Sequence, residues 1–130
     1  MNIEIIEQSF SVCKLSALPP AEALGKFCFI GKTDEEISLV CPTQELPDSV
    51  TECEHGWRAF RFQGVLDFSL VGVLAKLSAL LAEQEIGIFA ISTYNTDYIL
   101  TKTEHFDRAV SILEQNGYHI KTSGTNGDGA

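Results

Sequence analysis

Basic residues are scarce in this sequence. Nine Lys and Arg stand against eighteen Asp and Glu among 130 residues, which gives a formal net charge of −9. A surface this acidic repels nucleic-acid phosphates and anionic lipid headgroups. We therefore expect no nucleic-acid partner and no membrane partner, and the sign of the charge also argues against an RNA-recognition module.

The chain also lacks a run that is apolar enough to cross a membrane. Its most apolar stretch, residues 68–82, contains Lys76 and is shorter than the about 20 apolar residues that a spanning helix needs. The opening residues MNIEIIEQSF include two glutamates and no basic residue, so they lack the positive start of a secretory signal. These features predict a soluble, cytoplasmic protein.

The cysteines do not have the spacing of a metal site. They stand at positions 13, 28, 41 and 53, without a CxxC pair and without a nearby pair of histidines. Cys28 and Cys41 lie inside apolar runs, where a free thiol behaves as a small hydrophobic group. We expect reduced cysteines in the core, no metal and no cofactor; a disulfide, a metal site and a nucleophile are the open alternatives.

Candidate catalytic groups are scattered. The histidines at positions 55, 105 and 119 are far apart and have no evident Ser, Cys or carboxylate partner, so we expect surface or packing roles for them. An enzyme of the acylphosphatase type would need an anion cradle after its first strand, whereas the loop GVLDFSLVG carries Asp67 there. We expect no enzymatic activity.

What the sequence does contain is clearest in its second half. Residues 57–65 are rich in aromatic and apolar residues, which predicts a strand. Asp67 and Ser69 are candidate caps for a helix that ends near Glu85, with Gly87 just beyond it. Apolar residues recur along this helix at the spacing of one helical face: Leu70, Val73, Leu74, Leu77, Leu80 and Leu81.

Two further strands, residues 86–94 and 97–102, are predicted around a tight turn at residues 95–96. Thr103 is a candidate cap for a second helix, and Asn116–Gly117 is a typical helix stop before a last short strand, YHIK. The order β-α-β-β-α-β over residues 57–121 predicts an α+β, ferredoxin-like fold: an antiparallel sheet with both helices on one face.

The first half has strand signals and weaker helix signals. Residues 8–15, 26–33 and 36–42 are predicted strands, and LPPAEALG allows one helical turn. The closing TSGTNGDGA is too polar and glycine-rich to pack. We therefore divide the chain into a strand-rich first half at residues 1–55, a ferredoxin-like domain at 56–121 and a disordered tail at 122–130.

Two stretches of the second half resemble the ACT domain family. The first is LDFSLVGVLAKLSALLAEQEIGIFAISTY, in which Gly72, the apolar helix face and Ile86 fall at matching positions; the second and more discriminating is IFAISTYNTDYIL. The likeness covers about residues 56–115 and is closest to ACT domains of small bacterial proteins, aspartokinase regulatory regions and the cytosolic arginine sensors. Val71 and Ser69 depart from it, because proline and aspartate are frequent there. The first half resembles a degenerate ACT-like half.

This resemblance implies a non-catalytic, allosteric regulatory protein that binds an amino acid or a similar small zwitterion, and that forms a homodimer with the ligand at the interface. An amino acid needs an anion for its ammonium, donors for its carboxylate and a shaped cavity. Asp97 would take the ammonium. Backbone N–H groups of residues 68–72 would take the carboxylate. The predicted ligand-binding residues are Asp67, Phe68, Ser69, Leu70, Val71, Gly72, Ser92, Thr93, Tyr94 and Asp97.

Other readings of the same residues remain open. Asp97 beside Asn95 and Thr96 also fits simple turn chemistry, because such side chains bond their own backbone. Gly72 would equally serve to let the helix approach the sheet. The alternative function is a protein-interaction or dimerisation module that keeps the fold without a ligand.

Overall fold

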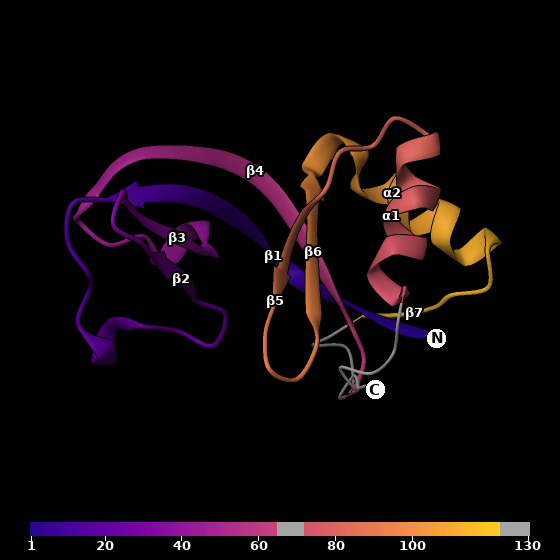
Figure 1. Cartoon of the computed structure of the whole chain (residues 1–130), viewed down its shortest axis with the longest axis horizontal. Coiled ribbons are helices and arrows are strands. Elements are labelled where there is room, and N and C mark those ends of the chain that lie inside the picture. Colours follow the sequence, from indigo (N-terminus) through magenta and orange to yellow (C-terminus); the bar gives the residue numbers. More distant parts are fainter. Residues whose placement is uncertain (65–71, 123–130) are drawn as a thin grey trace. The chain divides into compact units, whose positions relative to one another are not determined.

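The computed structural model describes residues 1–64 and 72–122. In chain order the elements are β1 (Asn2–Leu15), the 3-10 helix η1 (Ala21–Ala23), β2 (Phe29–Lys32), β3 (Ile37–Pro42), the 3-10 helix η2 (Thr43–Glu45), β4 (Val50–Phe62), α1 (Val73–Glu83), β5 (Phe89–Ser92), β6 (Asp97–Lys102), α2 (Thr103–Gln115) and β7 (His119–Thr122) (Figure 1). The expected caps Asp67 and Ser69 lie outside the described residues, as do residues 123–130 of the tail predicted at 122–130. Thr122 is wrong as the first residue of that tail, because it ends β7 and is opposite Ile5 of β1. No helix within the two described ranges is long and apolar enough to span a bilayer.

The chain forms two compact units. The helical unit comprises Met1–Glu7 and Arg58–Ala130, and the strand unit comprises Gln8–Trp57. The long strands β1 and β4 each contribute to both units. The expected division at residues 55 and 56 stays a prediction; the compact units divide close to it and add the first seven residues to the second half.

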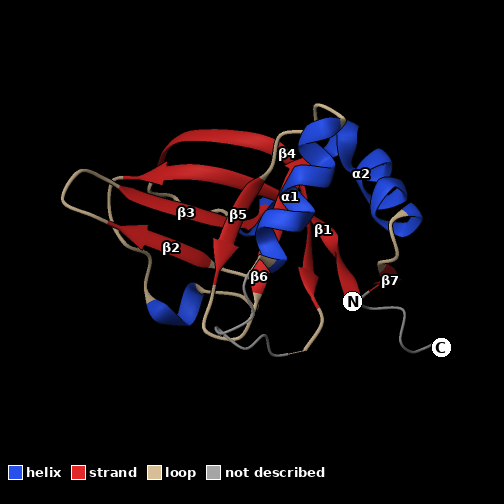
Figure 2. Ribbon diagram, turned by 45° about the vertical axis from the view of Figure 1, so that its right-hand side comes forward, coloured by secondary structure: helices blue, strands red, loops and turns tan. Residues whose placement is uncertain are grey.

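The helical unit contains the predicted order β4-α1-β5-β6-α2-β7. Its strands lie in the order β5-β6-β4-β1-β7, and both helices cover one face (Figure 2). The expectation of a purely antiparallel sheet is wrong at one edge, because β7 pairs with β1 in parallel, with Asn2 opposite His119. The reason is that the N-terminal strand is inserted between β4 and β7.

The core of the helical unit lies between the sheet and the two helices. Alternate residues of β4 point into it, and α1 and α2 contribute residues at helical spacing, as the sequence predicts. Leu77 and Leu81 of α1 are fully buried, and each such side chain contributes about 1.5–3 kcal/mol through removal from water. The buried members are Ile3, Phe60, Phe62, Leu77, Leu81, Ile86, Ile99, Phe106, Ala109 and Leu113.

Both helices end in the same hydrogen-bonded motif. In α2, the N–H of Tyr118 donates to Leu113 O at 3.1 Å and Gly117 takes the left-handed conformation, as the Asn-Gly signal predicts. In α1, the N–H of Ile86 donates to Leu81 O at 3.0 Å, but the left-handed residue is Glu85, with φ 60°. The helix therefore ends at Glu83, before the predicted residue. Thr103 is the first residue of α2 rather than its cap, which is Lys102.

The β5–β6 turn is longer than predicted. Ser92 is opposite Asp97, which leaves a four-residue loop at residues 93–96 instead of the two-residue turn. The Thr93 side chain explains the difference, because its Oγ1 donates to Thr96 O at 2.9 Å and accepts from Thr96 N at 3.3 Å. These bonds close the loop without a glycine.

The strand unit has the order β1-η1-β2-β3-η2-β4, with strands arranged β2-β3-β1-β4. Its short core contains Leu15, Leu39 and Cys41 as buried members. Cys28 and Cys41 are free, as expected, and burial is the first cause that raises the pKa of Cys41 to about 11, so this thiol stays protonated at neutral pH. The expectation of reduced cysteines is wrong for Cys13 and Cys53, which form a disulfide because β1 and β4 bring their Cα atoms to 4.2 Å.

Candidate functional site

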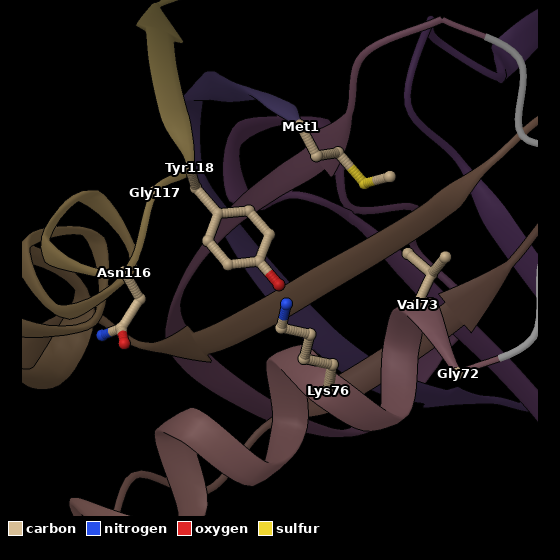
Figure 3. A pocket seen from close by; sticks show the side chains of 7 residues that line it. All are labelled: Met1, Gly72, Val73, Lys76, Asn116, Gly117 and Tyr118. Atoms are coloured by element: carbon tan, nitrogen blue, oxygen red, sulfur yellow. The ribbon is translucent and has the colours of Figure 1, made fainter.

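A cavity of about 310 Å³ lies at one end of the helical unit, beside the first turn of α1 and the turn between α2 and β7. Its described lining is drawn in Figure 3 and consists of Met1, Gly72, Val73, Lys76, Asn116, Gly117 and Tyr118. Ligand pockets in proteins typically measure about 300–1,000 Å³, so this one suits a small molecule.

Gly72 forms the first side of the cavity. It has φ 85° and ψ 3°, a left-handed conformation that residues with a side chain rarely adopt, and its carbonyl accepts the N–H of Lys76 at 2.8 Å. A Cβ placed on Gly72 would meet nothing within 4 Å. The glycine is therefore required by the backbone conformation, and the reading in which it lets the helix approach the sheet is wrong.

Tyr118 reaches the cavity because of the way α2 ends. The left-handed Gly117 reverses the chain, and the bond from Tyr118 N to Leu113 O fixes the position of Tyr118 itself. Burial raises the pKa of the Tyr118 phenol above its usual value, so the hydroxyl stays protonated at neutral pH and can donate a hydrogen bond. The side-chain amide of Asn116 bonds the end of α2, since its Nδ2 donates to Ile112 O at 2.8 Å.

Lys76 closes the opposite side. Its ammonium group and the Tyr118 hydroxyl point toward one another in the cavity (Figure 3). Val73 and Met1 supply apolar wall. Lys76 and Tyr118 thus offer two converging side-chain donors next to an apolar surface, which suits a small molecule with at least one acceptor group.

The polar hairpin lies at the same end of the sheet. Thr96 Oγ1 donates to Phe62 O at 3.0 Å, which joins the hairpin to the end of β4. The N–H of Gln63 donates to Asn2 O at 2.9 Å, and the N–H of His119 donates to Met1 O at 3.0 Å. These bonds lead across the end of the sheet from the hairpin to Met1, which lines the cavity.

Within the hairpin, Ser92 and Asp97 are brought together: Ser92 Oγ donates to Asp97 Oδ1 at 2.6 Å. Thr93 is engaged in the loop, and Tyr94 is 83% exposed. Among the residues that the structure describes, Ser92 is the one side-chain partner of the Asp97 carboxylate. The second carboxylate oxygen therefore keeps its capacity to accept a hydrogen bond.

The predicted site is brought together only in part. Gly72 lines the cavity, whereas the hairpin residues Ser92, Thr93, Tyr94 and Asp97 are not among its described lining. Asp67, Phe68, Ser69, Leu70 and Val71 lie outside the described residues. Lys76 and Tyr118 line the cavity without having been predicted. The sequence around Lys76 shows only a charge within an apolar run, whereas the Asn-Gly signal before Tyr118 indicates a fixed turn.

Two of the histidines, at positions 55 and 105, have side-chain partners that the sequence did not reveal. His55 Nδ1 lies 2.7 Å from Ser11 Oγ, but Ser11 is fully buried and also bonds Thr43 Oγ1 at 2.8 Å, so this contact supports β1. His105 Nε2 lies 3.6 Å from a Glu104 carboxylate oxygen on the surface of α2. Among the described residues no three His, Cys, Asp or Glu side chains form a group that could hold a metal ion.

Comparison with known proteins adds a family and a fold. The model of the ACT domain family matches residues 52–115. The chain is similar to protein Atu0741 from Agobacterium tumefaciens, with 30% identity, a TM-score of 0.81 and coverage of 94% of this chain and 92% of that one. No curated protein matches the chain.

Two aspartate kinase structures share the fold at lower identity. The chain is similar to aspartate kinase from Clostridium acetobutylicum, an allosteric enzyme, at 17% identity and a TM-score of 0.62, with 83% of this chain and 32% of that one covered. It is similar to the regulatory subunit of aspartate kinase from Thermus thermophilus, in its ligand-free form, at 13% identity and a TM-score of 0.59, with 87% and 94% covered.

Proposed function

The chain belongs to the ACT domain family, a family of regulatory, ligand-binding domains, and we propose that it is a non-catalytic regulatory protein whose helical unit binds a free amino acid. The observation that carries this proposal is the cavity beside Gly72, at the end of the sheet that also holds the polar hairpin. Its volume of about 310 Å³ suits a ligand of this size.

The proposal gives each part of the ligand a partner. The chain that enters α1, predicted at residues 68–72, takes the α-carboxylate through backbone N–H groups. The Asp97 carboxylate takes the α-ammonium, with Ser92 holding one of its oxygens at 2.6 Å so that the other faces the ligand. Thr93 and Tyr94 border the ligand's side chain.

A second copy of the chain completes the site in this proposal. Asp97 and the cavity lie at one end of the sheet, yet the hairpin is not part of the described cavity lining. We propose a homodimer in which the hairpin of one copy faces the cavity of the other. A ligand bound there favours the dimer arrangement that places both sides at the right distance, which is how binding would be passed to a partner protein.

The strand unit is proposed to be a degenerate ACT-like half. Its elements follow the same β-α-β-β-α-β plan, with η1 and η2 in place of the two α-helices. Its strands lie in the order β2-β3-β1-β4, which is the ferredoxin-like order. Its short helices leave it without a counterpart of the α1 turn that begins at Gly72, so we assign the ligand to the helical unit.

Isothermal calorimetry and thermal unfolding of the full chain with each of the twenty amino acids test the proposal. We expect one or a few of them to raise the unfolding temperature, because a ligand present at 100 times its Kd stabilises the folded state by about 2.7 kcal/mol. Asp97→Ala should abolish the response, and Asp107→Ala, which removes an exposed aspartate of α2, should leave it unchanged.

A folded protein that responds to none of the twenty amino acids would contradict the proposal. It would favour the interaction module, in which the bonds of Ser92 and Thr93 within the hairpin are turn chemistry only.

A further inference from the structure

The cavity beside Gly72 carries a positive charge in a chain that is strongly acidic. The formal net charge is −9, yet the described lining residues include Lys76 and no Asp or Glu. A cationic cavity favours an anionic ligand group over a neutral or cationic one, even on a protein of net negative charge.

Lys76 differs from the arginines of the helical unit in its pairing. Arg61 contacts Glu4 at 3.1 Å, Arg58 lies 3.8 Å from Glu7, and Arg108 donates to Gln84 O at 3.2 Å. Lys76 forms no ion pair with any residue of the described ranges, and its ammonium points into the cavity instead (Figure 3). This position places the charge where a ligand in the cavity can contact it.

Tyr118 adds a second donor at the same point. Its hydroxyl is directed toward the Lys76 ammonium (Figure 3). The hydroxyl oxygen can accept a hydrogen bond from the ammonium, but the hydroxyl proton then still needs an acceptor. A ligand carboxylate fits this arrangement, because it accepts from an ammonium with one oxygen and from a hydroxyl with the other.

The distance along α1 indicates which carboxylate this is. Lys76 comes one helical turn after Gly72, which corresponds to a rise of about 6 Å. The proposed function assigns the α-carboxylate to the chain that enters the helix, so a group one turn further along is the end of the ligand's side chain. Aspartate and glutamate carry a second carboxylate one or two methylene groups beyond the α-carbon.

We propose that Lys76 and Tyr118 determine the specificity of the site and select an amino acid with an acidic side chain, an inference that rests on the proposed function. Lys76 neutralises the side-chain carboxylate and Tyr118 donates to it. Asparagine and glutamine have the same shape without the charge, so they are the ligands against which the site discriminates.

Calorimetry with four ligands separates the possibilities. For the unaltered chain we expect aspartate or glutamate to bind about five- to tenfold more tightly than the matching amide, since a partly exposed charged contact is worth less than a buried one. Lys76→Met should remove this preference, and Tyr118→Phe should reduce it. The control is Lys121→Met, which makes the same change of charge on β7, outside the described cavity lining, and should keep the preference.

Each result has one meaning. Amino-acid binding without a preference for the acidic pair would overturn this inference and leave the proposed function standing, whereas no binding of any amino acid would overturn both. A preference that survives Lys76→Met would show that other residues set the specificity. Because Lys76 is exposed, its variant should unfold at the same temperature as the unaltered chain without ligand, which separates loss of binding from loss of fold.

Discussion

The two units contain hairpins built on one plan. In each, a four-residue strand is joined by a four-residue loop to a six-residue strand, with Phe29 opposite Val40 in the strand unit and Phe89 opposite Leu100 in the helical unit. The loops close alike as well, since Thr33 N donates to Glu36 O and Thr93 N donates to Thr96 O, both at 2.9 Å. These two hairpins therefore do not distinguish the units.

The helices that come after the two hairpins do distinguish the units. After β3 the chain forms only η2, three residues long, whereas after β6 it forms α2, thirteen residues long. Prolines account for the difference: Pro42 and Pro47 flank η2, and a residue before proline avoids the helical conformation. The shorter helices cover less of the sheet, so the strand unit has a smaller core. It also lacks a counterpart of the first turn of α1, which borders the cavity beside Gly72.

The largest effect that we expect comes from the core under the two α-helices. Phe60→Ala should lower the free energy of unfolding by about 3–5 kcal/mol, because it leaves a void at the centre of the helical unit. Leu39→Ala in the smaller core of the strand unit should cost about 2 kcal/mol, the low end for such changes. Urea unfolding followed by circular dichroism measures both; equal costs would contradict the difference between the cores.

The Cys13–Cys53 disulfide lies within the strand unit. Cys13 and Cys53 are 40 residues apart, so their bond restricts the unfolded chain, and reduction should cost about 2–4 kcal/mol of stability. Because both cysteines belong to the strand unit, amino-acid binding in the helical unit should persist. Thermal unfolding and calorimetry with and without a thiol reductant give the two readings, and Cys28→Ser serves as a control that leaves the bond intact.

A smaller effect is expected at the end of α2. Gly117→Ala places a side chain on a residue with φ 93°, which should cost about 1 kcal/mol and displace Tyr118. Gly31→Ala is the matched control in β2, where a Cβ meets nothing within 4 Å and φ is ordinary. Unfolding and ligand titration of both variants measure the loss of stability and of binding. Weaker binding in Gly31→Ala alone would contradict the expectation, because it would place the site in the strand unit.

The smallest effect is a gain. Glu85 occupies the left-handed position at the end of α1 that Gly117 occupies after α2. Glu85→Gly should therefore stabilise the helical unit by up to about 1 kcal/mol, because glycine adopts this conformation without steric cost. A lower unfolding temperature for this variant would contradict the expectation. It would show that the Glu85 side chain stabilises the fold by more than its left-handed backbone conformation destabilises it.

Local patterns were enough to predict most of the helical unit. The aromatic and apolar residues around Phe60 and Phe62 predict a strand, and the spacing of Leu77 and Leu81 predicts a helix with one buried face. Both predictions are confirmed, because these four side chains lie in the core. The pairing of β7 with β1 was not predictable in this way. It depends on a strand more than 100 residues earlier in the chain, and neither strand carries a signal of its partner.

The site was only partly predictable for the same reason. A polar interruption in an apolar run marked the hairpin, and the structure pairs Ser92 with Asp97 there. Lys76 and Tyr118 come from different segments, and only the packing of α1 beside the end of α2 brings them to one cavity. The disulfide was missed because Cys13 and Cys53 meet through the pairing of distant strands.

An amide chemical-shift titration of the full chain with glutamate shows directly whether the helical unit holds the ligand. We expect shifts at Gly72, Lys76 and Tyr118, and none in the hairpin loop of the strand unit at residues 33–36. A spectrum that does not change, or that changes only in the strand unit, would contradict the claim that the helical unit holds the ligand.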